Sequence, residues 1–133
     1  MPHLYVEQSP LTVPAPLRGQ IKRPDYLVAI PHVGMIAFDV KCKSVYQRRF
    51  LFDVDEVQKC QVFSRLFRMT LLFACLDPEG SDQSDWVRLD QLDITAAHAR
   101  NGKLVLSFHL GDALPASMSQ SFLKAFFDSV ELR

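Results

Sequence analysis

The sequence lacks the features that define several common classes of protein. It has no long uninterrupted apolar run, so no segment is expected to span a membrane, and no signal peptide is expected because no basic stretch precedes an apolar one at its start. Glycine-rich phosphate loops, nucleophile elbows, cysteine–histidine dyads and internal repeats are also missing. We therefore expect neither a P-loop enzyme nor a serine or cysteine hydrolase, and no organic cofactor.

Cysteine and histidine are too scattered for a disulfide framework or a zinc site. The cysteines, Cys42, Cys60 and Cys75, are odd in number and lie in apolar surroundings, and the four histidines stand singly. Structural zinc needs paired ligands at short spacing, whereas isolated thiols are typical of a reducing compartment. The sequence thus predicts free thiols and a cytoplasmic location.

An excess of either charge is missing too, since fifteen basic and fifteen acidic side chains give a net charge of zero. This disfavours a protein that coats nucleic acid non-specifically, because such binding rests on a basic surface. Binding of nucleic acid by a local basic patch is still compatible with this composition. Basic residues gather in two places that flank the segment 23–44: Arg18, Lys22 and Arg23, then Lys41, Lys43, Arg48 and Arg49.

What is present is the composition of a globular protein, with 48% hydrophobic and 23% charged residues. A chain of 133 residues fits one domain with its own core. Six of the eight prolines fall within the first 31 residues, so residues 1–22 are expected to form a proline-rich arm with a short strand at "HLYVE". Residues 23–92 would form the central part and residues 93–133 a helix–strand–helix.

Periodicity predicts a mixed α/β (α+β) domain with a central mixed β-sheet flanked by helices. The strands "DYLVAI" and "MIAFDVKCKS" form a hairpin, "RRFLF" is a linker, and Asp53 caps a helix over roughly 54–68. A buried strand "TLLFACLD" and a strand "WVRLDQL" follow. "DITAAHARNG" is expected to be a short helix that ends at "NG", "KLVLSFHL" a strand, and a last helix begins at Ser117 or Ser119.

Three charged side chains share the less apolar face of the predicted hairpin. Alternation puts Asp39 and Lys41 on this face of the second strand. If the loop is His32–Gly34, with Gly34 in the left-handed region, Asp25 lies opposite Lys41 and diagonal to Asp39. Opposite neighbours are about 5 Å apart and diagonal ones roughly 7–8 Å, close enough to share one cation. The simpler alternative is a solvated sheet face with an Asp–Lys pair.

Two carboxylates and a lysine in this arrangement suit phosphodiester hydrolysis. Magnesium takes oxygen ligands and keeps several waters, so one or two carboxylates suffice to bind it. The bound ion lowers the pKa of a coordinated water and stabilises charge on the phosphate. A lysine two residues beyond a ligand lies on the same strand face, where it can orient or deprotonate that water.

The letters "PD", then thirteen residues, then "DVK" resemble the PD-(D/E)xK signature of restriction endonucleases and Holliday-junction resolvases. In that family the two halves lie on adjacent strands followed by a helix and another strand, so the resemblance covers residues 23–92. It implies a restriction-endonuclease-like core and a DNA endonuclease dependent on Mg²⁺ or Mn²⁺. In such an enzyme Asp25, Asp39 and the Val40 carbonyl would bind metal, and Lys41 would position or activate the water.

The resolvase branch is the nearest in pattern, which implies branched or recombination and repair intermediates as substrates. Members carry a glutamine on the helix after the motif, and we expect Gln58 in that role, with Gln61 as the alternative. Lys43, Arg48 and Arg49 could contact DNA phosphates, unless they form only a solvated basic loop. Resolvase relatives act as two-fold dimers, so the expected partners are DNA and a second copy of the chain.

One common feature of the family is missing, namely an acidic residue on a helix before the first motif strand. Here that region is the proline-rich arm, which offers only Glu7. The missing acid favours a second hypothesis, a catalytically inactive nuclease-fold module that binds DNA or another protein. A third hypothesis is a toxin-type nuclease domain of a longer protein.

Overall fold

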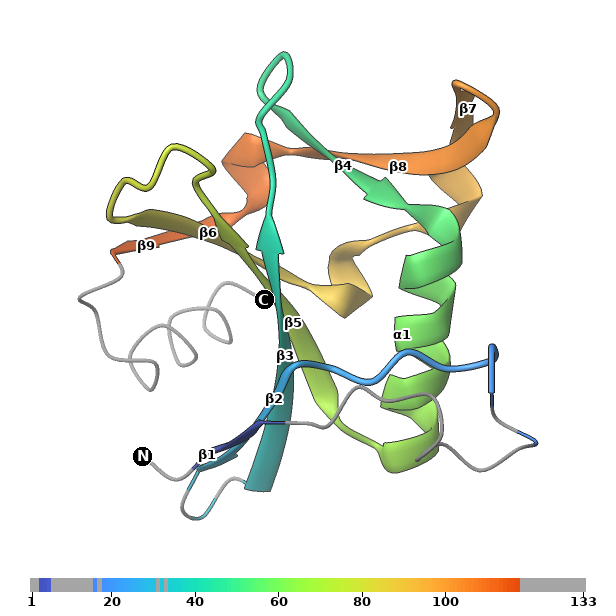
Figure 1. Cartoon of the computed structure of the whole chain (residues 1–133), viewed down its shortest axis with the longest axis vertical. Coiled ribbons are helices and arrows are strands. Elements are labelled where there is room, and N and C mark those ends of the chain that lie inside the picture. Colours follow the sequence, from blue (N-terminus) through green and yellow to red (C-terminus); the bar gives the residue numbers. More distant parts are fainter. Residues whose placement is uncertain (1–2, 6–15, 17, 31, 33, 118–133) are drawn as a thin grey trace.

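The computed structural model describes residues 3–5, 16, 18–30, 32 and 34–117. One α-helix lies in this part of the chain, α1 (Val54–Phe67). The strands are β1 (His3–Tyr5), β2 (Tyr26–Ile30), β3 (Gly34–Cys42), β4 (Arg49–Asp53), β5 (Thr70–Leu76), β6 (Gln83–Arg88), β7 (His98–Arg100), β8 (Lys103–His109) and β9 (Leu114–Ser117). They form a six-stranded mixed sheet in the order β1-β2-β3-β5-β6-β9 and a three-stranded antiparallel sheet, β4-β8-β7 (Figure 1).

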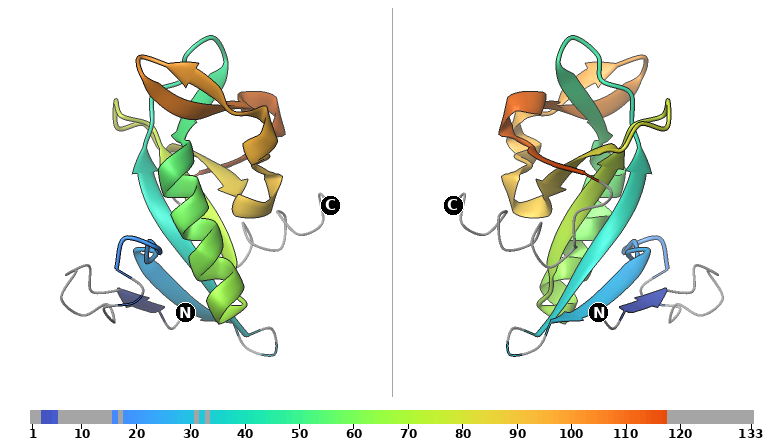
Figure 2. Two further views of the ribbon diagram at one scale, coloured as in Figure 1. Left: turned by 90° about the vertical axis from the view of Figure 1, so that its right-hand side faces the viewer. Right: turned by 90° about the vertical axis from the view of Figure 1, so that its left-hand side faces the viewer.

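Helix α1 connects the parallel neighbours β3 and β5 and lies across one face of the large sheet (Figure 2). It begins where predicted, because the Asp53 carboxylate accepts hydrogen bonds from the backbone N–H groups of Asp55 and Glu56. It ends at Arg68, which adopts the left-handed conformation with φ 53°. The buried strand predicted directly after the helix is β5, whose residues 71–75 are all buried.

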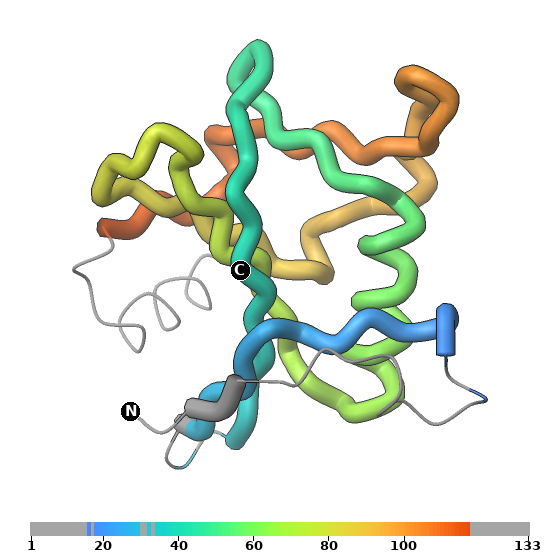
Figure 3. Tube along the Cα trace, viewed as in Figure 1, coloured from blue at the N-terminus to red at the C-terminus, as the bar shows by residue number. Residues whose placement is uncertain are grey.

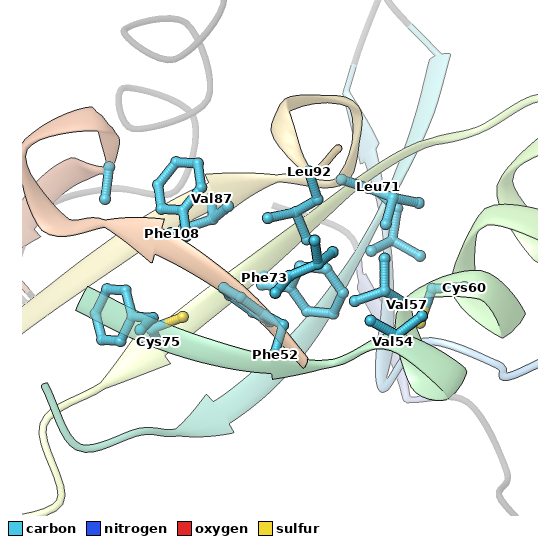
Figure 4. Packing of buried hydrophobic residues seen from close by; sticks show 14 of the residues in the cluster. Phe52, Val54, Val57, Cys60, Leu71, Phe73, Cys75, Val87, Leu92 and Phe108 are labelled. Carbon is cyan, nitrogen blue, oxygen red and sulfur yellow. The ribbon is translucent and has the colours of Figure 1, made fainter. Parts of the chain in front are cut away.

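The main core fills the space between α1, the large sheet and the small sheet (Figure 4). Phe52 of β4 packs on Phe73 of β5, with ring centres 5.2 Å apart. Burying a side chain of this size contributes about 1.5–3 kcal/mol. The α1 side of β3 contributes Ala37 to this core, so the face that also carries Asp39 and Lys41 is covered, and the alternative of a solvated sheet face is wrong.

The opposite face of β2 and β3 carries a second, smaller apolar cluster. Val28 and Ile36 are paired across the two strands and pack with Leu72 of β5. Beside them the rings of Tyr26 and Phe38 stack with centres 5.0 Å apart. The face of the hairpin opposite the charged side chains is therefore the more apolar one, as strand alternation predicts.

The hairpin register differs by two residues from the predicted one. Ile30 pairs with Gly34, so Gly34 belongs to β3 and not to the loop predicted at His32–Gly34. His32 takes a positive φ of 65°, and Gly34, with φ 118°, opens β3. A shift of two preserves which side chains share a face, so only the partners of each side chain change.

The segment "RRFLF" is not a linker, because most of it forms β4. This strand pairs with β8, with Phe50 opposite Phe108 and Phe52 opposite Leu106. All four of these side chains are buried in the main core. Leu51 between the two phenylalanines obscured the alternation that would have predicted a strand.

The segment "DITAAHARNG" forms a 3₁₀ turn (Ile94–Ala96) and strand β7 rather than a short helix. Asn101 and Gly102 make the turn from β7 into β8, and both have positive φ, 51° and 80°. Two-residue hairpin turns require this conformation and favour Asn-Gly. The "NG" pair thus closes a hairpin instead of ending a helix.

The remaining elements follow the sequence in part. The strand expected at "HLYVE" is β1, which pairs with β2, and the strand "KLVLSFHL" is β8. The strand expected at "WVRLDQL" begins earlier, at Gln83, and ends at Arg88. Ser117 is the last residue of β9, so the last helix does not begin there, and the prediction that it begins at Ser119 falls outside the described residues. No helix in the described part of the chain is long and apolar enough to cross a membrane.

Candidate active site

The two halves of the predicted motif meet at the start of β2, just before Tyr26. Tyr26 pairs with Phe38, so the same register places Asp25 opposite Asp39 rather than opposite Lys41. The Val40 N–H donates a 2.8 Å hydrogen bond to Asp25 Oδ2. Because the N–H and C=O of one strand residue point to the same side, the Val40 carbonyl also faces the side of the strand where Asp25 lies.

Asp39 is a buried carboxylate with its two oxygens in different surroundings. Its side chain is 1% exposed. Oδ2 accepts a 2.6 Å hydrogen bond from Lys22 Nζ and lies 3.0 Å from Lys41 Nζ. Oδ1 is buried and has no hydrogen-bond partner among the described residues. A buried charged oxygen without a partner is costly, which makes this atom a candidate ligand for a cation and rules out a solvated sheet face.

Glu56, in the first turn of α1, adds a third carboxylate. Its Oε1 accepts a 2.6 Å hydrogen bond from Lys22 Nζ and forms an ion pair with Lys41 Nζ. Each lysine therefore contacts both Asp39 and Glu56. Neither Lys22 nor Glu56 was predicted as a site residue. From the sequence alone, Lys22 belongs only to a basic cluster and Glu56 only to the predicted helix.

The electrostatic surroundings give the two lysines opposite properties. Burial lowers the pKa of Lys41, and the neighbouring Lys22 lowers it further, with partial opposition from Asp39. Burial also acts to lower the pKa of Lys22, but the hydrogen bond with Asp39, the contact with Lys41 and the charge of Asp39 together outweigh it, so the net pKa is raised. Lys22 therefore stays cationic, and Lys41 is the lysine that loses its proton more easily.

The two aspartates are also separated by their surroundings. Burial acts to raise the pKa of Asp39, but the hydrogen bond from Lys22 and the charge of Lys41 outweigh it and lower the pKa. Burial raises the pKa of Asp25, the Val40 N–H opposes this, and the neighbouring Asp39 adds to the rise. Two carboxyl groups this close favour a shared proton or a shared cation.

These donors fit a hard divalent cation. Asp25, Asp39 and the Val40 carbonyl supply only oxygen atoms, and one of these is buried without a partner. In the part of the chain that the structure describes, no three or more His, Cys, Asp or Glu side chains form a metal cage. Magnesium does not need one, because it keeps several waters and binds through one or two carboxylates.

The structure does not bring the predicted glutamines to these carboxylates. Successive helical residues lie about 100° apart, so Gln58 points roughly 160° away from Glu56 around α1, and it is exposed. Gln61 lines a cavity of about 550 Å³ at the other end of the helix, together with Arg68 and Thr70. Glu56, rather than Gln58 or Gln61, is the helical residue beside Asp39.

The three predicted phosphate-binding residues have different surroundings. Lys43 is partly buried; its Nζ donates a 2.7 Å hydrogen bond to the Leu51 carbonyl and lies 4.7 Å from the centre of the Phe52 ring. Burial lowers the pKa of Lys43, and its charge is used inside the fold. Arg48 and Arg49 are exposed, as a role at the surface requires.

No protein-family model matches the sequence, and no curated protein matches it. Among solved structures, the chain is similar to Hjc, a Holliday junction resolvase from the archaeal hyperthermophile Archaeoglobus fulgidus, with a TM-score of 0.54 and 16% sequence identity. The similarity covers 85% of this chain and 82% of that chain. At this identity the likeness shows the fold alone. The chain has a mixed α+β, restriction-endonuclease-like fold, as its sequence predicts.

Proposed function

We propose that the protein is a metal-dependent endonuclease that hydrolyses phosphodiester bonds in DNA. The observation that carries the proposal is the buried Asp39 carboxylate, which has one oxygen without a partner beside a second carboxylate, Asp25, and a lysine, Lys41. The resolvase-like fold supports it. The metal would be Mg²⁺ or Mn²⁺, bound by the two aspartates and the Val40 carbonyl.

Each side chain has a role that its contacts suit. A divalent cation in this site would supply a water of lowered pKa and positive charge beside the phosphate. Lys41 is held by Asp39 and Glu56 and has a lowered pKa, so it would orient the attacking water or accept its proton. The water oxygen bonds to phosphorus as the bond to the leaving sugar oxygen breaks.

DNA contacts are proposed on the outer face of the small sheet and on the loop before it. The stretches 40–52 and 94–111, which supply most of β4, β7, β8 and this loop, contain no Asp or Glu. Surfaces with only basic charge attract the phosphate backbone. The exposed basic residues on these stretches are Arg48, Arg49, Arg100 and Lys103.

An aromatic ring adds to this basic surface. Tyr46 is 54% exposed, and the guanidinium carbon of Arg100 lies 4.9 Å from the centre of its ring. Stacked arginine and tyrosine side chains are suited to unpaired bases and to the adjoining phosphates. Since the loop begins shortly after Lys41, DNA bound here would extend toward the carboxylates.

We propose branched DNA as the substrate, supported by the similarity in fold to a Holliday junction resolvase. A four-way junction has two-fold symmetry, so two equivalent cuts call for two copies of the site. A homodimer is therefore part of this proposal. Sedimentation analysis with and without a junction would test it.

Cleavage assays on a labelled four-way junction, a duplex and a single strand test the function, each with Mg²⁺, Mn²⁺ or a chelator. We expect metal-dependent cutting that Asp39→Asn and Lys41→Met each reduce by about 10²-fold or more. Arg65→Gln, an exposed change on α1, is the control and should leave cutting intact. If both site variants cut at the parent rate, the assignment is wrong.

One observation favours a second candidate, an inactive nuclease-fold module that binds DNA. Lys22 and Lys41 together already neutralise Asp39 and Glu56 without any metal. Such a module would bind the junction but cut no substrate with either metal, and it would show no Mn²⁺ binding dependent on Asp39. The same assays therefore separate the two candidates.

A further inference from the structure

The segment that precedes β2 crosses α1 before it enters the large sheet (Figure 3). The backbone N–H of Lys22 donates a 3.2 Å hydrogen bond to the Lys59 carbonyl of α1, and Ile21 packs against the main core. These contacts hold the backbone of Lys22 beside the helix. Its side chain can therefore reach the carboxylates from the side of α1 rather than from the motif strands.

Lys22 makes the same carboxylate contacts as Lys41. Its Nζ lies 2.6 Å from both Asp39 Oδ2 and Glu56 Oε1. Lys41 contacts the same two oxygens. Two ammonium groups on one pair of oxygens repel each other. Lys22 is the more exposed of the two, with 30% of its side chain exposed against 17% for Lys41, so it is the one with room to move away from Asp39.

The charge of the cluster points the same way. Three carboxylates (Asp25, Asp39 and Glu56) and two ammonium groups leave a net charge of −1. With Lys22 held by Glu56 alone, the two aspartates that would bind the metal carry −2, which matches one divalent cation. A metal on Asp39 would bring two positive charges close to the Lys22 ammonium, and like charges at that range oppose each other strongly in a partly buried site.

We propose that Lys22 is a resident counter-ion of the site and that a divalent cation binds Asp39 by displacing the Lys22 ammonium, which Glu56 retains. The inference rests on the proposed metal site. It adds that the segment before β2 controls how readily that site takes up metal. Glu56 is suited to hold the displaced lysine because it already contacts the same Nζ atom from α1.

Mn²⁺ binding to the full chain, followed by electron paramagnetic resonance of the unbound ion without DNA, tests the inference. Lys22→Met removes the competing charge and should bind Mn²⁺ at least about tenfold more tightly than the parent. Lys22→Arg keeps the charge and should stay within about threefold of the parent. Lys59→Met is the matched control, because Lys59 is also a lysine near this segment but pairs with the exposed Asp55.

The outcomes distinguish this inference from the proposed function. If Asp39→Asn abolishes Mn²⁺ binding but Lys22→Met binds as the parent does, the metal site stands and Lys22 is not its competitor. If the parent and Lys22→Met both fail to bind Mn²⁺ at millimolar concentration, the metal site and the inference are both wrong. An equal gain in Lys59→Met would also overturn the inference, since the effect would then come from net charge alone. Circular dichroism confirms that each variant is folded.

Discussion

Asp25 Oδ2 accepts a 2.8 Å hydrogen bond from the Val40 N–H, so the two halves of the motif are joined across the hairpin although Asp25 lies just outside β2. This bond holds one carboxylate against the strand that carries the other, Asp39. Carboxylates held so close disfavour each other's charge. The fold thus holds two carboxylates close together, which lowers stability unless a cation lies between them. Functional sites commonly trade stability for activity in this way.

Asp25→Asn should stabilise the metal-free protein while removing metal binding. Asparagine keeps an oxygen for the Val40 N–H and removes the charge beside Asp39. The pKa of Asp25 is higher in the folded protein than in the unfolded chain. Above the folded-state pKa the charged Asp25 therefore lowers the free energy of unfolding, and this loss disappears as the pH falls below the unfolded-state pKa. Because Asp25 is partly exposed, we expect a gain of at most about 1 kcal/mol in the free energy of unfolding near neutral pH.

Urea unfolding with and without Mn²⁺ measures both effects of Asp25→Asn. The parent should gain stability from the metal and the variant should not. Glu79→Gln, at an exposed acid in the turn between β5 and β6, is the control for the general effect of removing one negative charge. A variant less stable than the parent in the absence of metal would contradict the explanation given for the Asp25 pKa.

The shared face of Asp25, Asp39 and Lys41 could be predicted because strand alternation depends only on local sequence. The register could not, since moving a three-residue loop by one position shifts the pairing by two residues and leaves the faces unchanged. Which face of β3 is buried depends on which elements pack against it. Helix α1 and the small sheet cover the face that carries Asp39, and this packing is part of the tertiary structure, which local sequence does not predict.

The contacts of Lys22 and Glu56 are even harder to predict from the sequence than the hairpin register. The two residues are 34 positions apart and come together only when the segment before β2 crosses α1. Neither has a periodic or motif signal, so each could be assigned only to a generic role, in a basic cluster or in the first turn of a helix. Sequence reasoning thus predicted the strand-borne part of the site and missed the part that helix packing creates.

Arg48→Gln and Arg100→Gln should weaken DNA binding without changing metal binding. Each removes one positive charge from an exposed surface that lacks acidic residues. For each phosphate that the protein no longer neutralises, the slope of log affinity against log salt should become shallower by about 1. Fluorescence anisotropy with a labelled junction at several salt concentrations measures this. Arg65→Gln, on α1, should leave the slope unchanged; an equal effect there would mean that only total charge matters.

Leu106→Ala and Leu104→Ala should differ sharply in stability, although both lie on β8. Leu106 is 3% exposed and faces Phe52 in the main core, whereas Leu104 is 56% exposed. Truncating a buried leucine costs about 2–5 kcal/mol because it leaves a cavity, and an exposed one about 0.5 kcal/mol or less. Urea unfolding of the two variants tests whether "RRFLF" is a core strand. Equal costs would show that β4 and β8 do not pair in this register.

The three thiols should react with iodoacetamide at very different rates. Cys42 is exposed at the end of β3, whereas Cys60 and Cys75 are buried. Burial raises the pKa of Cys60 to about 11 and that of Cys75 to about 12. Because only the thiolate attacks, the native protein at about pH 8 should take up one label, at Cys42, and three after unfolding in urea. Cys42→Ser should show no fast label by mass spectrometry. Rapid labelling of Cys60 would contradict the packing of α1 that brings Glu56 to Asp39.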